Sequence, residues 1–396
     1  MLARDEQNTP VDWVARARAL VPMIEAAGDR IEAERRIAPE VVAALHEAGL
    51  FRMLLPVSLG GHAADIIAFN QVIETIAAAD ASTAWCLAQQ VASTQAASFL
   101  DPAIAREIFA SPNGAVAWGP PSGAKAVATE GGYIVNGRWR FASGSEHCPW
   151  LGGHCAVFEA GGKPRLDQQG RPVMRTVLFR KEKATFTDIW HVLGLRGTAS
   201  NAYEVKDLFV PAAYSTWRDS APDRRGDEPL SRIPLLTLYG MGFSGVALGL
   251  ASACLEAFKT LAATKKPSPM HGAPIPLREH PTIQARVAEA TGQLQSACAY
   301  LHDMLRLFWD AAMAKRAVSL EQRAQLRIAI TGAIEQASRV VDFAFRTAGA
   351  DAIFQGSPFE RRFRDMHTVT AQGQAHLSNF EGAGQALFGI ETTQRL

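Results

Sequence analysis

The first hundred residues carry the hydrophobic pattern of helices. Ala, Leu, Glu and Arg dominate residues 11–111, and apolar side chains recur there every three or four positions. The series begins with Val14, Ala17, Leu20 and Ile24. Gly49 ends one predicted helix, and a loop with the sequence PVSLGG follows at 56–61. A second helix is then predicted to run through Ile73 and on past Trp85.

Beyond a turn-forming cluster at 111–114, the pattern changes to short strands. Apolar runs are separated there by Gly, Pro and Asn, as in an all-β layer. The runs span residues 115–118, 133–135, 138–142, 155–158, 176–179 and 203–210. This pattern predicts a β-domain in the middle of the chain.

Helical periodicity returns at about residue 235 and continues toward the end. One long apolar stripe consists of Ile283, Val287, Ala290, Leu294, Leu301, Leu305 and Phe308. Ser319 and Gln322 have the spacing of a capping box, which opens another helix. Five prolines between residues 265 and 281 predict a loop between two long helices. The predicted domains are a helical domain at 1–112, a β-domain at 113–225 and a helical bundle at 226–396.

Composition narrows the class of protein. The 396 residues include 40 Lys and Arg against 39 Asp and Glu, and this formal net charge of +1 argues against nucleic-acid binding. No apolar stretch is long enough to predict a membrane span, and the N-terminal segment lacks the apolar core of a signal peptide. Five scattered cysteines without a C-x-x-C pair indicate neither disulfides nor a metal site. A reducing, cytoplasmic location is therefore expected.

Three segments, in this order, resemble the acyl-CoA dehydrogenases. They are Leu50-Phe51 with Leu55-Pro56 and Gly60-Gly61, then NGRWRFASG at 136–144, then LGLRGT at 193–198 with Ser200. The resemblance spans nearly the whole chain. It implies a mainly α fold with a central β-domain: an N-terminal helical domain, a middle β-barrel or sandwich, and a C-terminal four-helix bundle.

A narrower resemblance is to one branch of that fold, the two-component flavin-dependent monooxygenases. It rests on ADASTAW at 79–85, on the W-x-F-x-S-G pattern at 139–144, and on RDMH at 364–367. The resemblance implies an oxygenase component that receives reduced FMN or FAD from a separate flavin reductase. Oxygen would add at flavin C4a, and the hydroperoxide would hydroxylate an aromatic or heteroaromatic small molecule.

Two other functions stay open. One is a dehydrogenase or oxidase with tightly bound FAD that acts on an acyl thioester or another small molecule. The other is a non-catalytic relative that binds flavin or another ligand. No G-x-G-x-x-G fingerprint follows a predicted strand, which agrees with a chain that binds no NAD(P)H.

The predicted flavin contacts begin in the strand at 138–142. Trp139, Phe141 and Ser143 alternate, so on one strand they would share a face that suits a flat ring with polar edges. By resemblance, Ser143 matches the position that hydrogen-bonds flavin N5. The alternative is an ordinary strand with both aromatic rings in the core and Ser143 in a turn. Arg196 and Thr198 are interpreted mainly as structural, with a contact to the phosphate end of the cofactor as the other reading.

The residues after this strand are candidates for the substrate pocket. They are Ser145, His147 and Trp150. His147 fits a solvated loop equally well. Trp85, in the second predicted helix, is interpreted as a core residue or as the wall of the pocket.

The predicted catalytic residues depart from the family pattern. In acyl-CoA dehydrogenases a glutamate lies nine positions after the Arg of the R-D motif, but here that position is Gly373. The alternative glutamate lies on the first bundle helix, yet residues 231–254 contain no Asp or Glu. Removing a carbon-bound proton requires a positioned base, so acyl-CoA oxidation is disfavoured. In the monooxygenase branch a histidine lies eight positions after the Arg, where this chain has Gln372.

His376 is the candidate to replace that histidine. It lies four residues after Gln372, so on one helix the two side chains would stack on the same face, aimed at the flavin. The alternative is that His376 is exposed and the Gln372 amide acts alone as a hydrogen-bond donor. His367 is expected to face other bundle helices.

Small residues in the first bundle helix predict close contacts between helices. They are Gly240, Gly242, Ser244, Gly245, Ala247, Gly249 and Ala251. Together with the resemblance, this stripe predicts a homotetramer.

Overall fold

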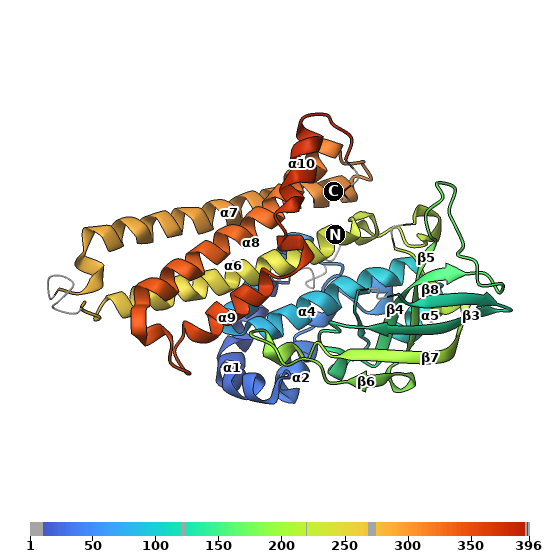
Figure 1. The fold of residues 1–396 in the computed structure, drawn as a ribbon, viewed down its shortest axis with the longest axis horizontal. Coiled ribbons are helices and arrows are strands. Elements are labelled where there is room, and N and C mark those ends of the chain that lie inside the picture. Colours follow the sequence, from blue (N-terminus) through green and yellow to red (C-terminus); the bar gives the residue numbers. More distant parts are fainter. Residues whose placement is uncertain (1–10, 121–122, 219, 268–274, 393, 395–396) are drawn as a thin grey trace, which may run out of the picture.

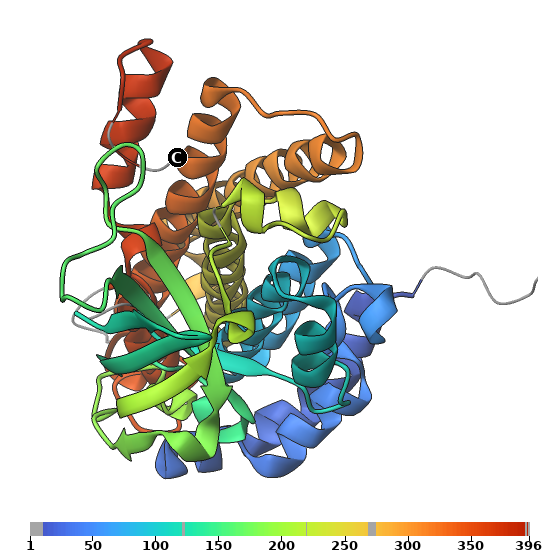
Figure 2. The same cartoon turned by 90° about the vertical axis from the view of Figure 1, so that its right-hand side faces the viewer.

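The chain folds into three successive regions: N-terminal helices, a β-sheet, and long helices (Figure 1). The computed structural model describes all residues except 1–10, 121–122, 219, 268–274, 393 and 395–396. In the view turned by 90°, the sheet lies on one side and the N-terminal helices on the other (Figure 2). The predicted mainly α fold with a central sheet is confirmed.

Five α-helices make up the described N-terminal region. They are α1 (Trp13–Glu34), α2 (Pro39–Glu47), α3 (Ile66–Ala79), α4 (Ala81–Ser93) and α5 (Pro102–Phe109). The single helix predicted through Ile73 and Trp85 is wrong, because Asp80 breaks it with an extended backbone (φ −151°, ψ 119°). The Asp80 carboxylate caps α4 by accepting from the backbone N–H of Thr83 at 2.7 Å. This break sets the direction of α4, the helix that carries Trp85.

One mixed sheet joins the strands of the described chain, in the order β6-β7-β3-β2-β4-β5-β8 with β1 beside β4. Its strands are β1 (Val116–Trp118), β2 (Lys125–Thr129), β3 (Gly132–Trp139), β4 (Trp150–Phe158), β5 (Met174–Arg180), β6 (Thr185–Thr187), β7 (Ala202–Pro211) and β8 (Ser215–Thr216). The sequence pattern does not predict β2, β6 and β8, because all three are short and partly exposed. The strand predicted at 138–142 is wrong beyond Trp139, because Phe141 has a left-handed φ of +61°.

The sheet has its own core, centred on Trp139. The Trp139 ring is fully buried, stacks on Tyr203 at 5.2 Å between centroids, and donates from Nε1 to the carbonyl of His154 at 3.1 Å. A Cβ at Gly153 would lie 2.5 Å from this ring, so the close approach requires glycine. Trp139 therefore holds the sheet together.

The C-terminal region packs around one central helix. Its helices are α6 (Leu235–Ala262), α7 (Pro281–Met313), α8 (Leu320–Ala348), α9 (Glu360–Val369) and α10 (Ser378–Leu387). The predicted capping box at Ser319 and Gln322 is confirmed, with both hydrogen bonds present. Part of the predicted proline-rich loop, residues 268–274, lies outside the described residues.

Helix α6 is long and apolar enough to cross a membrane by composition. In the fold, 83% of its most apolar window is buried against other helices. Glycines on α6 permit this packing, since a Cβ at Gly249 would lie 2.2 Å from the backbone oxygen of Glu74 on α3. The small-residue stripe thus serves contacts within the chain, and the prediction that it joins subunits has no support from the packing of α6.

Candidate functional site

A buried chain of hydrogen bonds surrounds Ser143. Trp85 on α4 donates from Nε1 to Ser143 Oγ at 3.0 Å, and Ser143 Oγ lies 2.7 Å from Ser200 Oγ. Ser200 Oγ in turn lies 2.7 Å from Thr198 Oγ1, which donates to the carbonyl of Leu195 at 2.9 Å. Four side chains and a backbone carbonyl therefore form one continuous path between α4 and the loop before β7.

The direction of this path follows from counting protons, because each hydroxyl has only one to donate. Thr198 uses its proton on Leu195, so the Ser200 hydroxyl must donate to Thr198. The Ser143 hydroxyl then donates to Ser200 while accepting from Trp85. Ser143 is left with one unused lone pair and no free proton.

The loop that carries Ser143 is anchored to the segment that carries Thr198. The backbone N–H of Gly144 donates to the carbonyl of Thr198 at 2.9 Å, and that of Ala142 donates to the carbonyl of Asn201 at 3.2 Å. Glycine suits position 144, where φ is +70°. These contacts give Ser143 a defined position although it lies outside a strand.

Two pairs of aromatic rings include a member of this path or a near neighbour of it in sequence. Trp85 is partly exposed and stacks on Phe243 of α6, with 4.2 Å between ring centroids. Phe141 is 48% exposed and meets the edge of Trp190. The prediction that Trp139, Phe141 and Ser143 share one strand face is wrong, because the strand ends at Trp139 and that ring faces the sheet core.

His147 is held by a neighbour on α4 and is not a solvated loop histidine. His147 Nε2 lies 2.8 Å from Gln90 Nε2 and 3.0 Å from Gln90 Oε1, and Gln90 Nε2 also donates to the carbonyl of Gly144 at 3.2 Å. Burial lowers the pKa of His147 to about 3, so the ring is neutral. The Ser145 hydroxyl beside it is fully buried without a hydrogen-bond partner in the described chain.

The two remaining candidates from the middle region, Trp150 and Arg196, have structural contacts. Trp150 is buried, stacks on Tyr214 and has the Arg180 guanidinium 4.2 Å above its ring, so its contacts are those of a packed core residue. Arg196 donates to the carbonyl of Val192 at 3.0 Å and pairs with Glu32 at 3.4 Å, as a structural residue would.

Two family models match most of the helical regions. "Acyl-CoA dehydrogenase, N-terminal domain" matches residues 14–104, and "Acyl-CoA dehydrogenase, C-terminal domain" matches residues 241–376, together more than half of the chain. The chain belongs to the acyl-CoA dehydrogenase family. The buried path at Ser143 falls between the two matched segments, apart from Trp85.

Relatives in this family are similar along nearly the whole chain. Indole-3-acetate monooxygenase of Pseudomonas putida is 29% identical over 388 residues, covering 96% of each chain. The oxygenase subunit HsaA of a flavin-dependent monooxygenase from Rhodococcus jostii is 27% identical and covers 94% of this chain and 96% of its own. The crystal structure of 3-HSA hydroxylase from Rhodococcus sp. RHA1 has a TM-score of 0.87 at 25% identity, covering 98% and 99%.

The position of the acyl-CoA dehydrogenase base is open space in this family member. A Cβ at Gly373 would meet no atom within 4 Å. Gln372 before it is an extended residue whose Oε1 accepts from the backbone N–H of Gln374 at 2.6 Å, while its Nε2 is buried without a partner in the described chain.

The prediction that Gln372 and His376 share one helical face is wrong. Helix α9 ends at Val369, and the two residues flank a single 3-10 turn, Gly373–Ala375. His376 is exposed and bonds to Ser378 Oγ at 2.7 Å. His367 faces the bundle as predicted, with Nε2 3.1 Å from Asp342 of α8. In the described chain, no contact joins Gln372 or His376 to Ser143.

Phe243 and Gln90 were missed in the sequence, and Ser200 was seen only as part of a motif. Phe243 stacks on Trp85 from another helix, Gln90 lies 57 residues before His147, and Ser200 lies 57 residues after Ser143. Asp365 was seen only as part of a motif, yet its carboxylate accepts from the backbone N–H of Leu195 at 2.6 Å and so fixes the end of the buried path. Burial raises the pKa of Asp365 to about 7.

One further cluster of possible ligand side chains lies between α3 and α7. It consists of Glu74, Cys298 and His302, whose ligand atoms lie within 4.8 Å of one another. Glu74 and His302 form a 2.8 Å ion pair. This pair connects the N-terminal helices to the bundle.

Proposed function

We propose that this chain is the oxygenase component of a two-component flavin-dependent monooxygenase. It would take reduced FMN or FAD from a separate flavin reductase and hydroxylate a small aromatic or heteroaromatic substrate. The activities of two relatives, a monooxygenase and an oxygenase subunit, support this function. The absence of Asp and Glu from residues 231–254, together with Gly373, argues against the acyl-CoA dehydrogenase reaction.

The observation that carries the proposal is the direction of the hydrogen bonds at Ser143. Reduced flavin has an N–H at N5, whereas oxidised flavin has only an acceptor there. Ser143 Oγ has one unused lone pair and no free proton, so it can accept from the reduced ring but cannot donate to the oxidised one. This arrangement supports a site that prefers flavin delivered in the reduced state.

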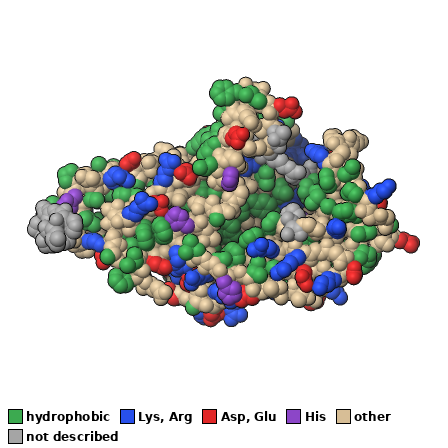
Figure 3. All heavy atoms as spheres, viewed as in Figure 1, with side chains coloured by type: hydrophobic (Ala, Val, Ile, Leu, Met, Phe, Trp, Pro, Cys, Tyr) green, Lys and Arg blue, Asp and Glu red, His purple; other side chains and the backbone are tan. Residues whose placement is uncertain are grey.

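The surroundings of Ser143 fit a flat ring with polar edges. Phe141 offers an exposed aromatic face, and Trp85, which bonds to Ser143, stacks on Phe243. The hollow seen below α10 in the space-filling view is lined largely by apolar side chains, which suits an aromatic substrate (Figure 3). When bound, reduced flavin would supply the oxygen activation, and the chain would position it and exclude water.

Other residues take supporting roles in this proposal. Neutral His147 and the unpartnered Ser145 hydroxyl would orient a polar group of the substrate. Gln372 Nε2 is a buried amide without a partner among the described residues and would donate to a ligand oxygen. Thr198 and Ser200 would fix the direction of the hydrogen bonds at Ser143. Arg196 would hold the loop that carries Thr198 in place through its ion pair with Glu32. A homotetramer in the cytoplasm remains part of the proposal.

The test compares Ser143→Ala with Ser200→Ala by anaerobic titration with reduced and oxidised flavin. Ser143→Ala should weaken reduced-flavin binding about tenfold, because a buried hydrogen bond of about 1.4 kcal/mol is lost. In Ser200→Ala the Ser143 hydroxyl no longer donates to Ser200 and can donate to N5 of oxidised flavin. This variant should therefore bind oxidised flavin more tightly, and the ratio of reduced-flavin to oxidised-flavin affinity should fall. Thr216→Val, which removes a remote buried hydroxyl bonded to the carbonyl of Phe99, is the matched control.

Two outcomes would contradict the proposal. An unchanged ratio of oxidised to reduced affinity in Ser200→Ala would mean that the hydrogen-bond direction does not select the redox state. A protein that is yellow as purified, and that an acyl thioester bleaches without a reductase, would instead be a dehydrogenase or oxidase.

A further inference from the structure

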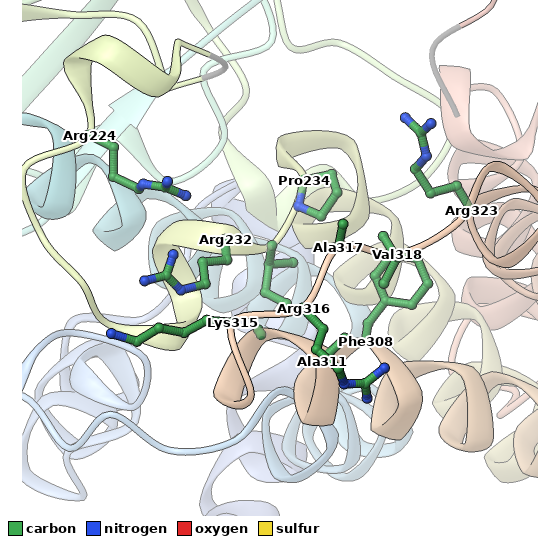
Figure 4. Close-up of a pocket in the computed structure, with 12 residues that line it drawn as sticks. Arg224, Arg232, Pro234, Phe308, Ala311, Lys315, Arg316, Ala317, Val318 and Arg323 are labelled. Atoms are coloured by element: carbon green, nitrogen blue, oxygen red, sulfur yellow. The ribbon is translucent and has the colours of Figure 1, made fainter.

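A cavity of about 400 Å³ lies where the ends of the long helices α6, α7 and α8 meet. Ser143 is not among the residues that line it. It is bordered by the segment before α6, the end of α7, the turn into α8 and the first residues of α8 (Figure 4). Its volume falls in the range of small-molecule sites. Its apolar wall includes Ile233, Pro234 and Phe308.

The lining is strongly basic. The five cationic side chains are Arg224, Arg232, Lys315, Arg316 and Arg323. One carboxylate, Asp227, compensates part of this charge by pairing with Arg232 and Lys315. Throughout the described ranges, the side chains of Arg224, Arg316 and Arg323 form neither an ion pair nor a hydrogen bond. An excess of positive charge therefore faces the cavity.

Two of the guanidinium groups are incompletely satisfied where water does not reach. The Nε atoms of Arg232 and Arg323 are buried and have no hydrogen-bond partner among the described atoms. A buried N–H without an acceptor is unfavourable, and in a cationic group the cost is larger. Both residues line the cavity, so a ligand there would lie next to their side chains.

Helix ends strengthen the positive potential. The first residues of α6 follow Pro234, which provides no side-chain cap, so backbone N–H groups at this end are left for another acceptor. The first turn of α8 contributes Arg323 from a second helix N-terminus.

The cavity is adjacent to the segment that carries Gln372. Phe308 and Arg323 also line a second, small cavity that reaches Arg327 and Ile330 along α8. Arg327 donates to Gln374 Oε1, and the backbone N–H of Gln374 donates to Gln372. A ligand in the basic cavity would therefore contact the same face of α8 that supports the Gln372 turn.

We propose that this cavity binds a phosphate or diphosphate group of a ligand. A lone carboxylate would leave most of the uncompensated cations unpaired, whereas a diphosphate carries enough charge and oxygen atoms for several guanidinium groups. Two sources share this chemistry: the phosphate tail of the flavin, and a phosphorylated or nucleotide-linked substrate. The site goes beyond the proposed function, because phosphate binding can be measured without flavin or oxygen.

The experiment is calorimetric titration of the full chain with pyrophosphate and with orthophosphate. Pyrophosphate should bind more tightly than orthophosphate, and its affinity should fall as salt is raised. Arg323→Gln and Arg232→Gln should each weaken pyrophosphate binding about tenfold. Arg306→Gln removes the same charge from an exposed position on α7, where the side chain is 60% exposed and pairs with Asp303, and should leave binding unchanged.

Flavin titrations separate the two sources. If the flavin tail occupies the cavity, pyrophosphate will compete with reduced FMN, and Arg323→Gln will remove the advantage of FMN over riboflavin. If a substrate phosphate occupies it, pyrophosphate and reduced FMN will bind together, and the variant will bind FMN normally. Equal pyrophosphate affinity in the parent, Arg323→Gln and Arg306→Gln, or no binding at millimolar concentration, would overturn the site while leaving the monooxygenase proposal intact.

Discussion

At the scale of single residues, the orientation of Ser143 depends on the side chains that form hydrogen bonds with it and with each other. Thr198 donates its proton to the carbonyl of Leu195, and Ser200 donates its proton to Thr198. Trp85 donates to one of the two lone pairs on Ser143 Oγ. A hydroxyl, which would otherwise rotate freely, becomes a fixed acceptor. Gln90 likewise forms hydrogen bonds with both the backbone of Gly144 and the ring of His147.

The neutral state of His147 predicts a loss of stability in acid. Its pKa of about 3 in the fold is below the unfolded value of about 6.5, so the unfolded chain binds more protons between these pH values. The stability contribution is complete above pH 6.5 and is lost as pH falls toward 3. Urea unfolding of His147→Gln between pH 4.5 and 6.5 should show a slope smaller by up to about 1.4 kcal/mol per pH unit. An unchanged slope would mean that the ring is protonated in the fold.

At the scale of elements, helix α6 is shaped by contacts with three neighbours. Gly240 lies against Ile330 of α8, Gly242 against Ala88 of α4, and Gly249 against Glu74 of α3. The absence of side chains brings these helices close, so α6 aligns the helix that carries Trp85 with the helix that borders the basic cavity.

A pair of glycine substitutions tests this packing. Gly249→Ala should lower the free energy of unfolding by about 1–3 kcal/mol, because its Cβ would meet Ala77 and the backbone of Glu74. Gly332→Ala on α8 has no atom within 4 Å of the new Cβ and should raise stability by about 0.5–1 kcal/mol through helix propensity. Denaturant melts measure both. Similar losses in the two variants would refute the tight α3–α6 contact.

At the scale of the whole molecule, regions far apart in sequence meet at a few polar links. Asp365 of α9 holds Leu195 in the β-region, and Glu74 of α3 pairs with His302 of α7. Apolar side chains remain uncovered near the C-terminal end, namely Leu377, Leu387, Phe388 and Ile390. Surface of this kind agrees with an assembly of several copies.

The molecular mass of the protein in solution tests the predicted homotetramer. We expect a homotetramer by light scattering at micromolar concentration, and Phe388→Asp should shift the mass toward smaller species because a charge cannot be buried unpaired in an interface. Val57→Asp, at another exposed apolar residue, is the control. A monomeric parent protein would contradict the assembly, and an unchanged mass in Phe388→Asp would exclude this end of the chain from the contact.

The sequence by itself determined the order of helices, sheet and bundle, because hydrophobic periodicity is a local property of the chain. It also determined the start of α8, since the capping box at Ser319 and Gln322 acts within one turn. The lack of a carboxylate at Gly373 needs no structure to be seen, and it already weighed against acyl-CoA oxidation. Ser143 was found through its motif.

Only the tertiary structure decided what surrounds Ser143 and where the other candidates lie. Its partners Trp85 and Ser200 are 58 and 57 residues away, so no local pattern announces them. Trp139 and Trp150 look like ligand contacts in sequence, yet packing places both in cores. The basic cavity could not be predicted from the sequence for the same reason. Its arginines come from three separate segments, and their charges lie close together only when the helix ends meet.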